Sequence, residues 1–371
     1  MKLRLFLFFL PMFAVMIAGH VYLYRRLVRD VTSHPLVRRG AIAAAVMFLA
    51  GIAFSRSRAE WPQWMMLAIA MWLGVFLYLL FARLVLSVVE AVVEAVAKPA
   101  DAARRQVLRR GLAAGSALIA LPTAGYGVFR AYEPAQVTDL TITLPGLPRT
   151  MSGFTIAQLS DIHIGPILRS QYVRDLVERT NALKPNIVAI TGDLVDGTPD
   201  EIGAHVALFR ALNAPVYFIT GNHDYYAGAT EWCAELERMG FTVLRNRFVA
   251  IEGLDLIGVD DWGNRRTGRR DYDLDRAIAG RDTQRASILL AHQPENLEAV
   301  ARAQIGLQLS GHTHGGQLFP ATLGAQAIWG ERRAGWSKFE GTQIYVSRGC
   351  GFVGPPMRVG SPPEIVRVTL V

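Results

Sequence analysis

Nine side chains of the types that bind metals or transfer protons follow five short apolar segments of this sequence. They occur, in order, in the motifs D-I-H, G-D, G-N-H-D, a single H and G-H-T-H. Carboxylate and amide oxygens and imidazole nitrogens are suitable ligands for divalent metals. Two such ions about 3.5–4 Å apart can hold both the attacking and the leaving oxygen of a phosphoryl transfer. The motifs therefore predict a dinuclear centre formed from Asp161, His163, Asp193, Asn222, His223, Asp224, His292, His312 and His314.

Chance placement is the competing interpretation, since a single histidine is more often a surface residue or a satisfied core residue than a ligand. The chain has eight histidines, however, and five of them lie in these motifs. The other three, His20, His34 and His205, have no such surroundings. Five motifs in order, each after an apolar segment, favour a functional site.

The segments that position these motifs are predicted to be strands of an α/β domain. Helical patterns at residues 169–183 and 230–239 separate several of them, and continuous apolar strands are typical of a sheet buried on both faces. The alternating residues 137–144 predict an edge strand. Ligands of open α/β sheets gather at the carboxyl ends of the strands, so the motif residues should converge. The apolar segments are residues 154–159, 187–190, 216–219, 254–259, 288–290, 307–309 and 344–346.

Charge and apolar content divide the chain into two parts. Apolar residues make up 51% of the 371 residues. Residues 1–130 contain 16 basic and 5 acidic side chains, whereas the rest contain 23 and 26, so the basic excess belongs to the apolar part. This distribution argues against a nucleic-acid-binding protein and favours a membrane protein with basic loops. The two cysteines, Cys233 and Cys350, allow either one disulfide or two free core thiols.

Four apolar runs in the first third predict four transmembrane helices, at residues 3–24, 40–54, 61–86 and 111–129. A spanning helix needs about 20 residues, so the second run requires help from its neighbours or a locally thin bilayer. A cleaved signal peptide is the alternative for the first run, but no small-residue cleavage motif follows it. Buried helices of a soluble domain are the alternative for all four, but the chain has too little polar surface to cover them.

The basic residues between these runs predict the orientation. The segments at residues 25–39 and 83–110 carry eleven Lys and Arg residues, against five on the other side. Under the positive-inside rule these segments are cytoplasmic, so both termini and everything after residue 129 lie outside. The pair Arg104-Arg105 before the fourth run also resembles a twin-arginine export signal, which would make the export machinery a partner.

The ordered motifs resemble those of the calcineurin-like metallophosphoesterase superfamily over roughly residues 138–371. Within it, S-D-I-H-I-G, G-N-H-D-Y-Y, H-Q-P, G-H-T-H-G-G-Q, S-R-G-C-G and P-P-M-R resemble the YkuE/YaeI-type branch of membrane-associated phosphodiesterases. The resemblance implies an α/β fold, a two-sheet metallophosphoesterase sandwich flanked by helices. In this chain it would be preceded by an all-α transmembrane region of about four helices.

The resemblance also implies a role for each motif residue. His223 would protonate the leaving oxygen or stabilise its charge, and Asp224 would orient the His223 imidazole. The attacking group would be a metal-bound hydroxide, and the cofactors would be two divalent ions of manganese, iron or zinc. The ligands would be Asp161, His163 and His314 for the first ion, Asn222, His292 and His312 for the second, and Asp193 for both.

Recognition of the substrate could depend on arginines outside these motifs. Arg348 and Arg358, in the glycine- and proline-rich tail, could contact phosphate if that tail borders the site. A polar loop could bind a second phosphate or a lipid head group, although a solvated loop paired with neighbouring aspartates would look the same. Its arginines are Arg265, Arg266, Arg269 and Arg270.

We therefore expect residues 1–130 to be a multi-pass transmembrane region, residues 131–150 a linker and first strand, and residues 151–371 the metallophosphoesterase domain. The expected function is hydrolysis of a phosphate ester, preferably a diester, or of a pyrophosphate, with a lipid-linked substrate as a candidate. The protein would lie in a bacterial-type cell membrane with its catalytic domain outside. One alternative is a cytoplasmic-face UDP-2,3-diacylglucosamine pyrophosphate hydrolase of lipid A synthesis. The other is a non-catalytic membrane sensor or assembly protein with a structural metal site.

Overall fold

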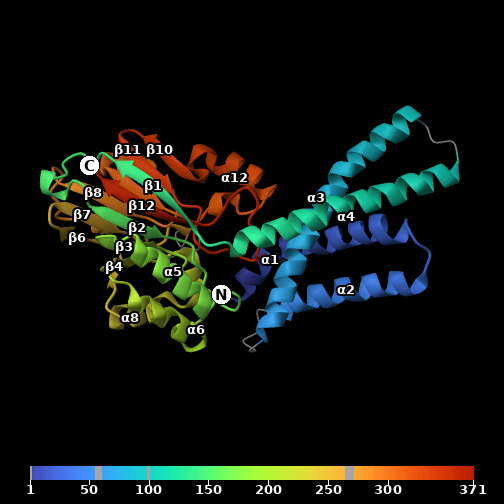
Figure 1. The fold of residues 1–371 in the computed structure, drawn as a ribbon, viewed down its shortest axis with the longest axis horizontal. Coiled ribbons are helices and arrows are strands. Elements are labelled where there is room, and N and C mark those ends of the chain that lie inside the picture. The colour runs from blue at the N-terminus through green and yellow to red at the C-terminus, as the bar shows by residue number, and fades with distance from the viewer. Residues whose placement is uncertain (1, 55–60, 98–100, 264–270) are drawn as a thin grey trace. The chain divides into compact units, whose positions relative to one another are not determined.

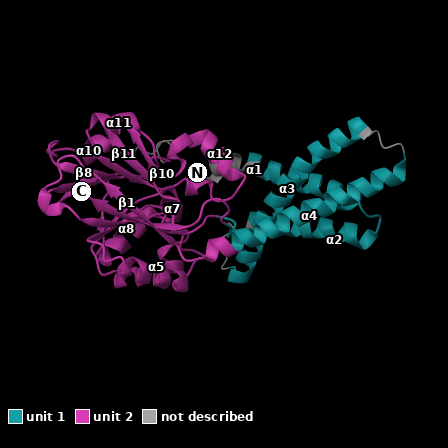
Figure 2. Ribbon diagram, turned by 45° about the horizontal axis from the view of Figure 1, so that its top comes forward, with its two compact units in different colours: residues 1–128, 354–357 teal, residues 129–353, 358–371 magenta. Residues whose placement is uncertain are grey.

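The chain forms two compact units in a computed structural model that describes residues 2–54, 61–97, 101–263 and 271–371. One unit consists of residues 1–128 together with residues 354–357 (Figure 2). The other consists of residues 129–353 together with residues 358–371. A short stretch of the C-terminal tail therefore belongs with the helical unit, although its flanking residues belong with the unit that carries the sheets.

The first unit is helical, and three of its described helices are long and apolar enough to cross a membrane. Three of the four predicted spans are therefore candidates by length and composition. The run at residues 3–24 also forms a helix, and its capacity to span stays a prediction. A π-helical turn, η1 (Tyr24–Arg29), follows it. The helices of this unit are α1 (Lys2–Leu23), α2 (Pro35–Phe54), α3 (Gln63–Ala97) and α4 (Ala102–Tyr132), the last three being the candidate spans.

The second unit contains two six-stranded mixed sheets (Figure 1). In the first sheet, β2, β3, β4 and β5 run parallel to one another, and β12 is antiparallel to β2. The predicted strand at residues 137–144 is confirmed as β1, which lies at the edge of this sheet and pairs with β12. The order is β1 (Gln136–Ile142), β12 (Glu364–Leu370), β2 (Thr155–Leu159), β3 (Ile187–Thr191), β4 (Val216–Ile219) and β5 (Thr242–Val243).

The second sheet has a parallel centre and antiparallel edges. Its strands β7, β8, β9 and β11 are parallel, while β6 and β10 are antiparallel to their neighbours. The order is β10 (Gly335–Phe339), β11 (Thr342–Val346), β9 (Leu307–Ser310), β8 (Ala286–Leu290), β7 (Leu254–Gly258) and β6 (Arg247–Ile251).

Alternating residues of the strands enter different cores, because successive side chains point to opposite faces. In β2, Ile156 packs with residues of the second sheet, whereas Ala157 packs with Val173 and Leu176 of α5. The predicted two-sheet sandwich with helices outside is thereby confirmed. Its helices are α5 (Ser170–Ala182), α6 (Pro199–Val206), α7 (Asn222–Ala227), α8 (Ala229–Arg238), α10 (Leu274–Ala277), α11 (Leu297–Arg302) and α12 (Ala321–Trp329).

The two cysteines are free thiols. Cys233 and Cys350 are both buried in the core between the first sheet and its helices. The interpretation as two core thiols is therefore the correct one. Burial also raises the pKa of each thiol to about 12, so both are unreactive at neutral pH.

Candidate metal centre

Five strands of the two sheets end at one place and carry all nine motif residues there. Asp161 and His163 follow β2, Asp193 follows β3, and His292 follows β8. The G-N-H-D motif begins α7 directly after β4, and the G-H-T-H motif follows β9. The predicted convergence is therefore observed, at the carboxyl ends of parallel strands from both sheets.

The backbone of these turns is unusual. Left-handed φ values occur at Asp161 (52°), His163 (54°), Asp193 (50°), His312 (71°) and His314 (49°). Such values are uncommon for residues with a Cβ atom and cost of order 1–3 kcal/mol each. The surrounding sheets hold the turns in this conformation, and strain of this kind is concentrated at functional sites.

Two motif glycines are required by close approach between turns. A Cβ atom at Gly221 would collide with the backbone nitrogen and the carboxylate of Asp193. A Cβ atom at Gly311 would collide with Ser160 and with the carboxylate of Asp161. Each glycine therefore lets one strand-end turn lie against the ligand-bearing turn of another strand.

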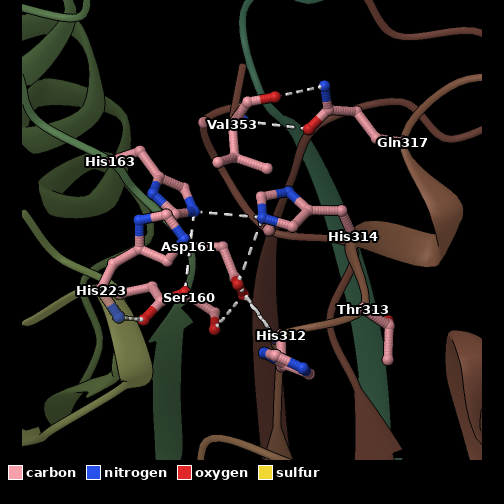
Figure 3. Close-up of polar contacts among 12 residues, drawn as sticks. Ser160, Asp161, His163, His223, His312, Thr313, His314, Gln317 and Val353 are labelled. Carbon is pink, nitrogen blue, oxygen red and sulfur yellow. Dashed lines mark hydrogen bonds and ion pairs between the residues drawn. The ribbon is translucent and has the colours of Figure 1, made fainter. Parts of the chain in front are cut away.

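The first group of candidate ligands is Asp161, His163 and His314. Figure 3 shows the two imidazoles pointing toward each other, with their Nε2 atoms 3.1 Å apart. Asp161 Oδ1 lies 3.4 Å from His314 Nε2. Ser160 Oγ donates to the other carboxylate oxygen of Asp161 over 2.6 Å, and the backbone nitrogen of His312 donates to Asp161 over 3.0 Å.

The second group is Asp193, His292 and His312. Asp193 Oδ2 lies 3.2 Å from His292 Nε2 and 3.9 Å from His163 Nε2. One carboxylate oxygen therefore lies within reach of ligand nitrogens from both groups, which is the position that a bridging ligand requires.

Divalent ions fit these residues. His163 Nδ1 donates to the Asp196 carboxylate over 3.2 Å, which leaves a lone pair on its Nε2 for a cation. His292 Nδ1 donates to the Thr191 carbonyl over 2.9 Å, which leaves its Nε2 as the ligand atom. Asn222 Oδ1 is buried and accepts no hydrogen bond from the described part of the chain.

The buried charges shift the pKa values of the candidate ligands in different directions. Burial lowers the pKa of His292, but the carboxylates of Asp193 and Asp161 outweigh it and raise the pKa well above its ordinary value. Burial raises the pKa of Asp193, but the charges of His292 and other neighbouring histidines outweigh it, and the pKa lies well below its ordinary value. Burial and the Arg358 guanidinium hold the pKa of His314 well below its ordinary value. At neutral pH Asp193 is therefore a carboxylate and His314 a neutral imidazole, the protonation states that metal ligands need.

His223 lies beside the first group without belonging to it. Its Nδ1 lies 2.6 Å from Asp196 Oδ1, and its side chain is 27% exposed. The same carboxylate also lies 3.2 Å from Nδ1 of His163. Burial lowers the pKa of His223, but the hydrogen bond to Asp196 and the charges of Asp193 and Asp196 outweigh it and raise the pKa to about 9.

We expected Asp224 to contact the His223 imidazole, but it does not. One of its carboxylate oxygens accepts from the backbone nitrogens of Gly221 and Asp193, over 2.7 and 2.9 Å. The other accepts from Leu194 and Val195, over 2.9 and 3.2 Å. Asp224 therefore joins the turns after β3 and β4, and the orienting role that we expected of it lies with Asp196.

Some of the candidate arginines lie outside the described residues, and the others have contacts that the structure gives. Arg265, Arg266, Arg269 and Arg270 lie outside the described residues. Arg358 is buried and donates to protein carbonyls, among them those of Gly351 and Arg348, and to His314 Nδ1 over 3.2 Å. Its guanidinium therefore supports a ligand from behind and does not offer a face to a substrate. Arg348 is half-exposed and donates to Glu364 over 2.6 Å.

The chain is similar to known phosphoesterases along most of its length. Residues 154–316 match the family model of calcineurin-like phosphoesterases. A transmembrane protein with a metallophosphoesterase domain from Bos taurus is 31% identical, covering 96% of this chain and 87% of the relative. A protein with the same name from Danio rerio is 32% identical, covering 83% and 74%. The uncharacterized metallophosphoesterase YkuE of Bacillus subtilis is 32% identical, covering 72% and 97%.

Proposed function

The chain belongs to the calcineurin-like metallophosphoesterase family, and on that premise we propose that its metal centre hydrolyses a phosphate diester or a pyrophosphate. Its relatives and its apolar helices identify it as a membrane enzyme of this family. A lipid-linked ester is the substrate class that suits an enzyme confined to a membrane.

The position of Asp193 is the observation that carries this proposal. Its Oδ2 atom lies within 4 Å of ligand nitrogens from both groups, as a dinuclear centre requires. Asp161, His163 and His314 would hold one ion, and Asn222, His292 and His312 would hold the other. When bound, such a pair of divalent ions activates water and neutralises charge on the phosphoryl oxygens.

The proton donor would be His223. Its Nδ1 hydrogen is directed to Asp196, so Nε2 is the atom available to a substrate. With a pKa of about 9, the ring is protonated at neutral pH and can give a proton to the leaving oxygen. A half-exposed, oriented imidazolium beside the ligands supports an enzyme over a purely structural metal site, which has no use for it.

The full-length chain in lipid nanodiscs provides the test. We expect hydrolysis of bis-p-nitrophenyl phosphate with added manganese, loss with chelator, and loss in Asp193→Asn. Asp175→Asn, an exposed aspartate on α5, is the matched control and should retain the activity. A folded wild-type protein that binds two ions per chain but cleaves neither diester nor pyrophosphate would exclude the proposal.

We also propose that the catalytic unit lies outside a bacterial-type inner membrane. The excess of arginines in residues 25–39 and 83–110 supports this orientation. The UDP-2,3-diacylglucosamine hydrolase alternative needs the cytoplasmic face. Protease added to intact spheroplasts should therefore degrade the unit, and full protection would favour that alternative.

A further inference from the structure

A cavity of about 290 Å³ lies outside the candidate ligands, and one of its lining residues, Trp329, contacts the candidate ligand His312. Its lining comes from the end of α12, the turn η5 (Gly330–Arg333) and strands β10 and β11. Its apolar lining comes from Trp329, Phe339 and Ile344. Nothing in the proposed hydrolysis uses these residues.

The cavity wall is built onto the G-H-T-H motif. The Trp329 ring lies edge-on to the His312 ring, with centroids 6.1 Å apart and planes at 86°. Arg333 Nη1 donates to the Gly315 carbonyl over 3.2 Å, and the hydroxyl of Thr313 donates to the Arg333 carbonyl. Trp329 is therefore the residue that the cavity lining shares with the surroundings of His312.

The lining also contains polar groups suited to an oxygen-bearing ligand. Ser337 is only 8% exposed, and its hydroxyl has no hydrogen-bond partner among the described residues. A buried hydroxyl without a partner is uncommon in a folded protein. Glu331, Arg332 and Lys338 also line the cavity, so that a hydroxyl, a carboxylate and two cations accompany the aromatic and aliphatic wall.

Helix α12 and strand β10 also carry exposed large apolar side chains. Ile328 is 70% exposed, Leu323 is 59% exposed and Trp336 is 52% exposed. Large apolar side chains that gather at the surface commonly mark a binding site.

We propose that this cavity binds the apolar chain of an amphiphilic phosphate ester whose phosphate lies at the metal centre. The ester or hydroxyl oxygen of that ligand accepts from Ser337, and the alkyl portion packs on Trp329 and Phe339. The inference rests on the proposed hydrolysis and assigns the substrate to the class of lipid phosphate esters.

The test compares p-nitrophenyl methyl phosphate with p-nitrophenyl octyl phosphate on the full-length chain in nanodiscs. Burial of the added methylene groups should raise kcat/KM for the octyl ester by about tenfold or more. Ser337→Leu fills the cavity and should abolish that advantage. Ser152→Leu, in an exposed turn before β2, is the matched control and should keep it.

Each failure has its own result. No hydrolysis of either ester would show that the proposed function is wrong. Equal kcat/KM for both esters, or an octyl advantage that Ser337→Leu retains, would overturn the lipid cavity and leave only partition into the bilayer. If Ser337→Leu does not fold, the wild-type chain is photolabelled instead with an octyl ester that carries a terminal diazirine. Labelling should fall within residues 328–344, and labelling elsewhere would overturn the inference.

Discussion

Asp196 accepts a 2.6 Å hydrogen bond from Nδ1 of His223 and lies 27 residues before it in the sequence. The same carboxylate lies 3.2 Å from Nδ1 of the candidate ligand His163. One side chain therefore orients both rings, because each Nδ1 donates to it and each Nε2 is left for another partner. The proposed proton donor and the candidate metal centre thus share one hydrogen-bond acceptor, Asp196.

Replacing the proton donor should separate catalysis from metal binding. We expect His223→Gln to lower kcat for bis-p-nitrophenyl phosphate by roughly 10²–10⁴-fold, while both ions stay bound. Steady-state kinetics and metal analysis of the same preparation check this. His205→Gln, a histidine on α6 bonded to Ser170, is the control, and an equal loss in both variants would contradict the assignment.

The rate should depend on the protonation of His223. Its pKa of about 9 lies above the ordinary value of 6.5, and only the protonated ring can donate. Deprotonation of His223 should therefore not lower the rate below about pH 9. Above that pH the rate should fall about tenfold per pH unit. A pH profile of kcat/KM checks this, and a fall that begins near pH 6.5 would contradict it.

Asp196→Asn should shift the decline of the rate at high pH to a lower pH. Without the carboxylate the imidazolium loses its strongest partner, so its pKa falls and the decline begins at lower pH. We also expect kcat at pH 7 to fall by roughly 10–100-fold, because a neighbour that orients ligand and donor is lost. A pH profile unchanged in shape would show that Asp196 has only a structural role.

Asp224 should matter for stability more than for protonation. In Asp224→Ala, four buried backbone donors lose their acceptor, at about 1–3 kcal/mol each when uncompensated. We expect the Tm of the catalytic unit to fall by about 10 °C or more, measured by differential scanning fluorimetry. Asp175→Ala, on the exposed face of α5, should shift it by less than about 2 °C.

The two ion sites should be separable by stoichiometry. Asn222→Ala removes an unpaired buried oxygen of the second group and leaves the first group intact. Metal analysis should give two ions per chain for the wild type and about one for this variant. Two ions in both proteins would remove Asn222 from the ligand set.

The fold and the ligand cluster could be predicted because the informative residues are scarce and ordered. Histidines after apolar segments identify strand ends, and strand ends converge in α/β sheets. The partner of His223 could not be predicted in the same way. His223 and Asp224 are adjacent on helix α7, so their side chains point about 100° apart and cannot pair.

The signal for Asp196 was present in the G-D-L-V-D turn, three residues after Asp193. It becomes informative only when the turns after β3 and β4 are known to touch. Arg358 shows the same limit, because its burial depends on the folding of the whole tail around His314. Such contacts join segments that no local pattern connects.

Left-handed turns determine whether this centre could be transferred to another protein scaffold. They lie at Asp161, His163, Asp193, His312 and His314. The same side chains copied onto ordinary strand ends of another scaffold would diverge, because their Cα–Cβ directions depend on those φ values. An engineer would have to transplant the turns and their glycines together with the ligands. For the same reason, substitutions at these positions during evolution are confined to residues that tolerate a positive φ. The centre can therefore lose a ligand far more easily than it can exchange that ligand for another type of residue.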